Sequence, residues 1–260
     1  MNRIGRWITA LILLVVLCMP SSGFELLIMQ KEVDHQIITG RFDPATEMGF
    51  VAIDSKYSIE RRYMQEEAYK AFAMMAEAAE KDRIILTIVS ATRNFDKQKE
   101  LWENKWYGRT KVEDLKLTRS HPDPMDRAYK ILEYTAPPGF SRHHWGTDID
   151  INSVEPEYFE TDEGKNVYFW LIKNAAKFGF SQTYLPKGIH TREHGFNEEK
   201  WHWSYLPLAI KYWAQLIDSY KPEMLHGFQG CESVRRIPLI EHYIISVNQA
   251  YFHDYVPDGF

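Results

Sequence analysis

Cysteine is scarce in this chain, and positive charge is not in excess. The 260 residues include two cysteines, and Lys and Arg number 31 against 36 Asp and Glu, which gives a net charge of −5. This balance argues against a protein whose main role is to bind nucleic acid phosphates. Internal repeats, low-complexity tracts and linkers rich in Pro, Gly or Ser are also missing. Nothing in the sequence therefore marks a second domain.

A hydrophobic run long enough to anchor the chain is lacking as well. The apolar stretch Ile8–Met19 is shorter than the roughly 20 residues that span a bilayer. Arg3 and Arg6 precede this stretch, and Pro20 and small residues follow it, which is the order found in a secretory signal. We expect cleavage after Gly23, and an uncleaved N-terminal anchor is the alternative.

Cleavage would leave residues 24–260 as a single domain, outside the cytoplasm and without stable membrane insertion. The protein would be periplasmic, extracellular or associated with the cell wall. Cys18 would leave with the signal, and Cys231 would remain alone. No intrachain disulfide could then form, so a packed core or a metal ion would have to stabilise the exported domain.

Hydrophobic periodicity and turn residues predict a mixed set of elements. Helices are predicted over 58–81, 95–107, 163–177, 207–220 and 236–253, and strands over 83–89, 147–152 and 199–205. These helices and strands do not alternate regularly. The pattern therefore predicts an α+β fold and not a doubly wound parallel sheet.

Two segments place histidine near carboxylates. In the first, a loop over 135–142 leads into His143, and Asp150 follows seven positions later on a predicted strand. In the second, Glu199 precedes His202 by three positions. A catalytic zinc ion takes three protein ligands and keeps one position open for water, whose pKa it lowers to about 7. His143, Asp150 and His202 could be the ligands, and Glu199 could be the general base.

The spacing alone leaves a second interpretation open. Histidine-rich loops also arise by chance. In that case, Asp148 and Asp150 would cap a helix or face solvent on a strand.

Three motifs carry a resemblance to a known family. They are Ser-x-x-Arg with a following glutamine (Ser90, Arg93, Gln98), Ser-x-His-x-x-Gly-x-x-x-Asp (Ser141, His143, Gly146, Asp150) and Glu-x-Trp-His (Glu199, Trp201, His202). In these motifs the sequence resembles the zinc D-alanyl-D-alanine carboxypeptidases and dipeptidases of the vancomycin-resistance type, which are related in fold to the Hedgehog signalling domain. The resemblance covers roughly residues 60–220.

The resemblance implies a small antiparallel sheet that carries the zinc site and is flanked by helices. It implies one Zn²⁺ per chain, bound by His143, Asp150 and His202, with Glu199 as general base. The resemblance also implies that three further residues contact the substrate.

Arg93 would help to hold the substrate and stabilise the tetrahedral oxyanion, which suits a permanently charged guanidinium. The alternative for Arg93 is a surface residue that caps a turn. Ser141 and Gln98 would line the backbone or carboxylate of the substrate.

The chain departs from the family pattern in three places. Asp148 stands where the family usually has a small residue, and it could orient a ligand histidine or face solvent. Thr92 stands where tyrosine is common. The polar segment 185–198 is expected beside the active site, where it could set substrate choice, with His190 and His194 exposed.

We expect an exported zinc metallopeptidase that cuts a peptide bond next to a D-amino acid in peptidoglycan stem peptides. An L,D-carboxypeptidase or a stem-peptide endopeptidase would use the same chemistry on another bond. A non-catalytic zinc-bearing binding module is the alternative of a different class. Glu199 and Arg93 argue against it, because a binder needs no base.

Overall fold

The computed structural model describes residues 35–188 and 193–248. The chain divides into two compact units, residues 1–36 and 37–260, and only His35 and Gln36 of the first unit are described. The expected signal and its cleavage after Gly23 lie outside the described residues and stay predictions. Within the described part of the chain, no helix is both long and apolar enough to cross a membrane.

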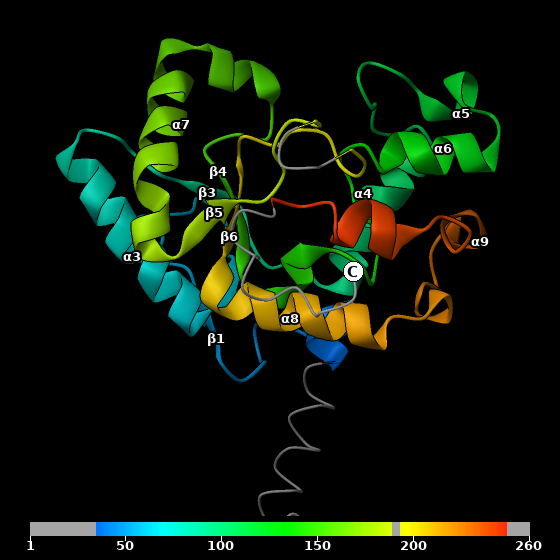
Figure 1. Ribbon diagram of the computed structural model, residues 1–260, viewed down its shortest axis with the longest axis horizontal. Helices are drawn as coiled ribbons and strands as arrows, with labels where there is room; N and C mark the ends of the chain where they lie inside the picture. Colours follow the sequence, from blue (N-terminus) through cyan, green and yellow to red (C-terminus); the bar gives the residue numbers. More distant parts are fainter. Residues whose placement is uncertain (1–34, 189–192, 249–260) are drawn as a thin grey trace, which may run out of the picture. The chain divides into compact units, whose positions relative to one another are not determined.

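A four-stranded antiparallel sheet forms the centre of the second unit (Figure 1). Its strands, in spatial order, are β3 (Ile88–Ser90), β4 (Asp148–Ile151), β6 (His202–Tyr205) and β5 (Phe180–Gln182). A separate two-stranded sheet pairs β1 (Phe50–Ala52) with β2 (Tyr63–Gln65).

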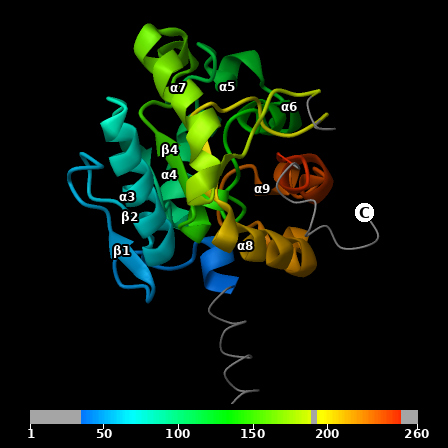
Figure 2. The same ribbon diagram turned by 60° about the vertical axis from the view of Figure 1, so that its left-hand side comes forward.

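Helices lie on both sides of the larger sheet, as both views show (Figures 1 and 2). The longer ones are α3 (Glu66–Lys81), α4 (Phe95–Trp106), α6 (Pro124–Ile131), α7 (Asp162–Asn174) and α8 (Leu206–Ser219). Short helices are α5 (Leu117–Ser120), α9 (Cys231–Val234), η2 (Arg142–Trp145), η3 (Pro156–Glu160), η4 (Ala175–Phe178), η5 (Pro222–Met224) and the π-helix η6 (Ile240–Ile244). The predicted α+β class is confirmed, with a small antiparallel sheet flanked by helices.

The two faces of the sheet differ in chemistry because successive strand residues point to opposite sides. Ile149 and Ile151 of β4 and Trp203 of β6 belong to a hydrophobic cluster that also contains buried side chains of α3 and α7. The residues between them, Asp148 and Asp150, are buried as well and point to the other face. One face is therefore apolar core, and the other carries buried polar side chains.

The predicted helix over 58–81 begins too early. Residues 63–65 form β2, and α3 begins at Glu66. The pairing of β2 with β1 satisfies backbone groups that a helix would otherwise bond. Glu66 and Glu67 then lie in the first turn of α3, where the helix dipole favours negative charge.

Two other elements differ from their predicted bounds. The strand predicted over 83–89 is reduced to β3, because Arg83 has φ 62° in the turn after α3 and the backbone N–H of Thr87 donates to the Asn152 side chain. The described part of the predicted helix 236–253 contains the π-helix η6, and residues 249–253 lie outside the described residues.

Gly146 joins η2 to β4 and has a backbone conformation that side chains disfavour. Its φ is 73°, and a Cβ atom there would lie 2.3 Å from Cε1 of Phe50. Glycine is therefore required at the point where the chain turns from His143 toward Asp148.

Candidate metal centre

The polar face of the sheet brings three of the predicted residues together. Asp150 of β4 lies opposite His202 of β6 in the strand register. His143 comes from the neighbouring helix η2, and its carbonyl accepts a hydrogen bond from the backbone N–H of Arg93. His143, Asp150 and His202 each offer a ligand atom, and these atoms all lie within 4.8 Å of one another.

His143 presents Nε2 to the centre of this group. Its Nδ1 lies 2.9 Å from the carbonyl oxygen of Ala91, and a carbonyl can only accept, so Nδ1 carries the proton. In the neutral ring, Nε2 then keeps a free lone pair. Nε2 lies 3.4 Å from Oδ1 of Asp150, and both atoms are buried with no hydrogen-bond partner among the described residues. Burial, followed by the charge of Arg93, lowers the pKa of His143.

His202 is oriented in the opposite sense and presents Nδ1. Its Nε2 lies 2.9 Å from Oδ1 of Asp148, while its Nδ1 lies 3.6 Å from Oδ1 of Asp150 and 3.1 Å from Oε2 of Glu199. Burial disfavours the charged ring, but the hydrogen bonds to Asp148 and Glu199 outweigh it and raise the pKa of His202 to about 9. Ligation through Nδ1 requires the loss of the proton on that atom.

Asp148 orients His202, and both of its carboxylate oxygens have hydrogen-bond partners. Its Oδ1 also accepts from Nε of Arg142 at 2.9 Å, and its Oδ2 accepts from the hydroxyls of Thr147 at 2.7 Å and Ser204 at 3.0 Å. Burial opposes ionisation of this carboxyl, but Arg142 and His202 outweigh it and hold its pKa below the usual range. Asp148 therefore contacts a histidine and does not face solvent.

His144 is adjacent to His143 but has no free nitrogen. Its Nδ1 lies 2.6 Å from the carbonyl oxygen of Arg93, and its Nε2 accepts from the N–H of Gly139 at 3.1 Å. Burial lowers the pKa of His144 to about 3, which keeps the ring neutral. Both nitrogens are committed to the backbone, so His144 is excluded as a ligand.

Two further predicted residues, Glu199 and Arg93, border the group. Glu199 is buried, and that burial raises its pKa. Arg93 is half-buried, and the negative charges of Asp150 and Glu199 act on it against the effect of burial, which lowers its pKa. The site therefore contains a carboxylate that can act as a base, Glu199, and a cation, Arg93.

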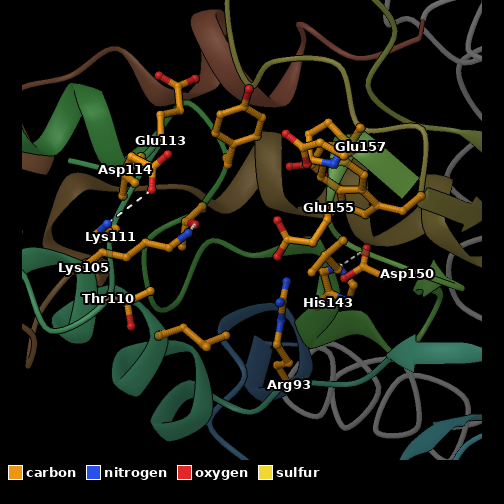
Figure 3. A pocket seen from close by; sticks show the side chains of 18 residues that line it. Arg93, Lys105, Thr110, Lys111, Glu113, Asp114, His143, Asp150, Glu155 and Glu157 are labelled. Atoms are coloured by element: carbon orange, nitrogen blue, oxygen red, sulfur yellow. Dashed lines mark hydrogen bonds and ion pairs between the residues drawn. The ribbon is translucent and has the colours of Figure 1, made fainter. Parts of the chain in front are cut away.

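A pocket of about 570 Å³ opens over this group (Figure 3). His143, Asp150, Glu199 and Arg93 line its wall, so four of the predicted residues are accessible to a ligand. The rest of the lining comes from α4, the loop 110–114, residues 134–135 and 154–157, and Trp201.

Ser141 and Gln98 are not part of the pocket lining, and their predicted contact with substrate stays a prediction. Both are buried, and neither lines the pocket. Nε2 of Gln98 donates to the carbonyl of Ala136 at 2.7 Å. No described residue of 185–198 lines the pocket; His194 is exposed as predicted, and His190 lies outside the described residues.

Several residues of the site carried no signal in the sequence. The carbonyl of Ala91 and the hydroxyls of Thr147 and Ser204 act through geometry that only the fold creates. Lys105 lines the pocket from α4, but in the sequence it is one of many lysines on an amphipathic helix.

Two of the three donor pairs have the separation that a tetrahedral metal ion requires, and all three donor atoms lie within 4.8 Å of one another. Two ligands bonded at roughly 2.0–2.1 Å to such an ion lie about 3.4 Å apart, and the donor pairs that involve Asp150 are separated by 3.4 and 3.6 Å. Each histidine is held through its other ring nitrogen, as metal-binding histidines usually are. With a buried carboxylate beside it, this is the arrangement that metal-dependent hydrolases use.

The family follows from a comparison with known proteins. Residues 61–208 match the model of the VanY family, described as D-alanyl-D-alanine carboxypeptidase. This match covers more than half of the chain, and the chain belongs to that family.

Two curated relatives are carboxypeptidases by name. The candidate carboxypeptidase YodJ of Bacillus subtilis (strain 168) is 30% identical over 179 residues, which are 65% of this chain and 56% of YodJ. A D-alanyl-D-alanine carboxypeptidase of Enterococcus faecalis (strain ATCC 700802 / V583) is 29% identical over 130 residues, 50% of this chain and 43% of the relative. The chain thus spans about half the length of these relatives.

Among solved structures, VanYB in complex with D-Ala-D-Ala is 22% identical, with 62% of this chain and 85% of VanYB covered and a TM-score of 0.43. The LD-carboxypeptidase LdcB is 21% identical, with 82% of this chain and 79% of LdcB covered and a TM-score of 0.48.

Proposed function

We propose that this chain is an exported zinc carboxypeptidase that removes a C-terminal D-alanine from peptidoglycan stem peptides. The observation that carries the proposal is the buried group of His143, Asp150 and His202, of which His143 and Asp150 line a pocket together with Glu199. Membership of the VanY family supports the substrate class. The order of charged, apolar and small residues near the N-terminus supports export, which would bring the enzyme to its substrate.

Zinc bound to these three residues would supply Lewis-acid polarisation and would lower the pKa of water at the site to about 7. Glu199 then performs the proton transfers. Its carboxylate accepts a proton from the attacking water as the new C–O bond forms, and delivers a proton to the nitrogen of the leaving amine as the C–N bond breaks. Burial, which raises the pKa of Glu199, favours a carboxyl that can hold this proton between the two steps.

Arg93 stabilises the charge that develops on the carbonyl oxygen. Its guanidinium lines the same pocket as His143 and Glu199 and lies on the strand-to-helix turn before α4. The backbone N–H of Arg93 donates to the carbonyl of His143 at 3.0 Å, and its carbonyl receives Nδ1 of His144. These bonds fix the turn that carries the cation relative to the ligands.

Mass spectrometry of a stem pentapeptide treated with the zinc-loaded chain tests the proposal. The expected product has lost one D-alanine, and Glu199→Gln should bind zinc normally but lose most of its turnover. A product cut within the stem would indicate an endopeptidase, and cleavage of the tetrapeptide alone would indicate an L,D-carboxypeptidase. No cleavage of any stem peptide by the zinc-loaded chain would favour a binding module.

A further inference from the structure

Lys105 extends into the pocket from the last turn of α4 (Figure 3). In this view it enters from the side opposite His143 and Asp150, with Arg93 between them. Its ammonium donates to the hydroxyl of Thr135, which also lines the pocket. No carboxylate of the described residues lies within ion-pair distance of it.

Neighbouring lysines are paired. Lys111, on the pocket rim, lies 3.3 Å from Asp114. Lys130 is almost as deeply buried as a core residue, with 13% of its side chain exposed, and it contacts both Glu113 and Glu133. The fold therefore gives Lys130 two carboxylates where it buries an ammonium, but gives none to Lys105.

An unpaired ammonium in this position costs free energy. Burial lowers the pKa of Lys105 to about 8; the negative charges of Glu199 and Glu155 oppose that effect without a direct contact, and Arg93 adds to it. Lys105 is half-buried in the pocket wall, and a cation that is partly shielded from water is stabilised by a nearby anion. The described residues supply no anion in ion-pair contact with Lys105, so a bound ligand would have to provide it.

Stabilisation of α4 does not explain the position of this lysine. A basic residue near a helix C-terminus can bond the last carbonyls. In α4, the carbonyls of Glu103, Asn104 and Lys105 already accept backbone N–H groups of the following turn. The side chain of Lys105 is directed to the hydroxyl of Thr135, another residue of the pocket lining, and not to these carbonyls.

We propose that Lys105 is a specificity-determining residue whose ammonium binds a carboxylate group of the peptide substrate. This inference rests on the proposed peptidase function. Two carboxylates of a stem peptide have the required chemistry: the C-terminal carboxylate next to the scissile bond, and a free carboxylate on a residue further from that bond. Either would form with Lys105 the charge-assisted contact that the chain itself does not provide.

Binding of defined peptides tests the proposal without turnover. Zinc-loaded Glu199→Gln and the double variant Glu199→Gln/Lys105→Gln are titrated with one stem pentapeptide in three forms: the free acid, the C-terminal amide, and a form with its internal carboxylates amidated. Lys105→Gln should weaken binding of the free acid by about 10- to 100-fold. For the form that lacks the partner carboxylate, the two proteins should bind equally, which identifies the carboxylate involved.

Matched variants separate recognition from structure. Lys97→Gln removes a lysine of the same helix that already pairs with Glu100 and should leave binding of all three peptides unchanged. Lys105→Arg should restore part of the affinity for the free acid. Thermal unfolding of Lys105→Gln should show no large loss of stability, because the neutral amide removes a half-buried charge that has no ion-pair partner among the described residues.

Three results would overturn the proposal: unchanged affinity of Lys105→Gln for the free acid, an equal loss of affinity for all three peptides, or no binding of any peptide by the protein that retains Lys105. A different result would contradict only the proposed function. In that case the peptides would bind with the predicted dependence on Lys105, while the wild-type chain would fail to cleave them.

Discussion

His143 and His144 are neighbours of the same residue type, and backbone contacts give them different roles. A single carbonyl, that of Ala91, occupies Nδ1 of His143 and leaves Nε2 available. Two backbone groups occupy both nitrogens of His144. The role of a buried histidine in this protein therefore depends on which of its nitrogens the surrounding chain already uses.

Asp148 occupies one ring nitrogen of His202 and leaves the other for a metal ion. Asp148→Asn should lower zinc affinity by about 10- to 100-fold, because the amide no longer holds Nε2 of His202 with a full negative charge. It should also lower stability, because Arg142 is left buried without its anion. Affinity is measured by competition with a chelator, and stability by thermal unfolding.

The double variant Arg142→Met/Asp148→Asn separates these two effects. It should regain stability relative to Asp148→Asn but should not regain zinc affinity. If Asp148→Asn bound zinc as tightly as the wild type, the proposed orientation of His202 by Asp148 would be wrong.

Arg93 lines the pocket beside His143 and Glu199. Arg93→Ala should lower kcat/KM by roughly 10²-fold or more, because its cation meets charge that grows in the transition state. Arg93→Lys should restore only part of this loss, since an ammonium does not reproduce the planar guanidinium. Steady-state kinetics on a stem pentapeptide measure both, and wild-type activity in Arg93→Ala would reduce Arg93 to a turn residue.

Motif residues could be predicted from the sequence because they are close together in the chain or follow a family pattern. His143, Asp150 and His202 lie close together, and Glu199 contacts His202, while the roles that the motifs imply for them stay predictions. Lys105 could not be predicted in this way, because its place in the pocket depends on how α4 packs and not on any local pattern. For Asp148 the sequence allows two interpretations, because strand alternation alone does not say which face of the sheet is covered.

At the scale of the element, strand β4 connects the core and the site. Ile149 and Ile151 hold one of its faces in the hydrophobic cluster with α3 and α7, and this fixes Asp148 and Asp150 on the other face. Since the side-chain period of a strand is two, a shift of one residue in the pairing would exchange the two faces. The apolar residues Ile149 and Ile151 therefore help to position the metal-ligand candidate Asp150.

Gly146→Ala tests the turn that leads into β4. The alanine would combine a positive φ with a clash against Phe50, so we expect a loss of roughly 1–3 kcal/mol in stability. Gly49→Ala is the matched control, because Gly49 has φ 86° but no atom within 4 Å of the added Cβ. Thermal unfolding should show a smaller loss for the control, and equal losses would mean that backbone conformation alone is responsible.

Long amphipathic helices could be predicted at this scale, while short strands could not. Helix α4 and the combination of α7 and η4 begin and end within a few residues of their predicted bounds, and Gly179 with φ 79° ends the latter. Strand β5 has three residues, too few to show an alternating pattern, and was missed. Strand β2 was absorbed into the predicted helix because its partner β1 is not recognisable from local sequence.

For the described molecule as a whole, two hydrophobic clusters of buried residues make up the core. One contains the apolar face of the sheet with α3 and α7, and the other contains buried residues of α4, α6, α8 and α9. Tyr184 of the second cluster packs its ring against His202, with 4.8 Å between the ring centroids. The second cluster thus borders the polar face and helps to exclude water from the ligand group.

The stability of the whole chain should depend on Lys105 and pH in a defined direction. The pKa of Lys105 is about 8 when folded, against 10.5 as its ordinary value, so burial of its charge opposes folding fully below pH 8. This cost disappears as pH rises from about 8 to 10.5. Lys105→Met should therefore melt at a higher temperature than wild type at pH 7, and the difference should shrink toward pH 10.5. A difference that grows with pH would contradict the assignment.

We predict that the polar face of the sheet holds one zinc ion through one atom each of His143, Asp150 and His202. Anomalous X-ray scattering from crystals of the zinc-loaded chain, recorded on both sides of the zinc absorption edge, tests it most directly. We predict one peak bonded to Nε2 of His143, Oδ1 of Asp150 and Nδ1 of His202, at about 2.0–2.2 Å from each. A peak at another site, or no peak in crystals soaked with zinc, would contradict the account.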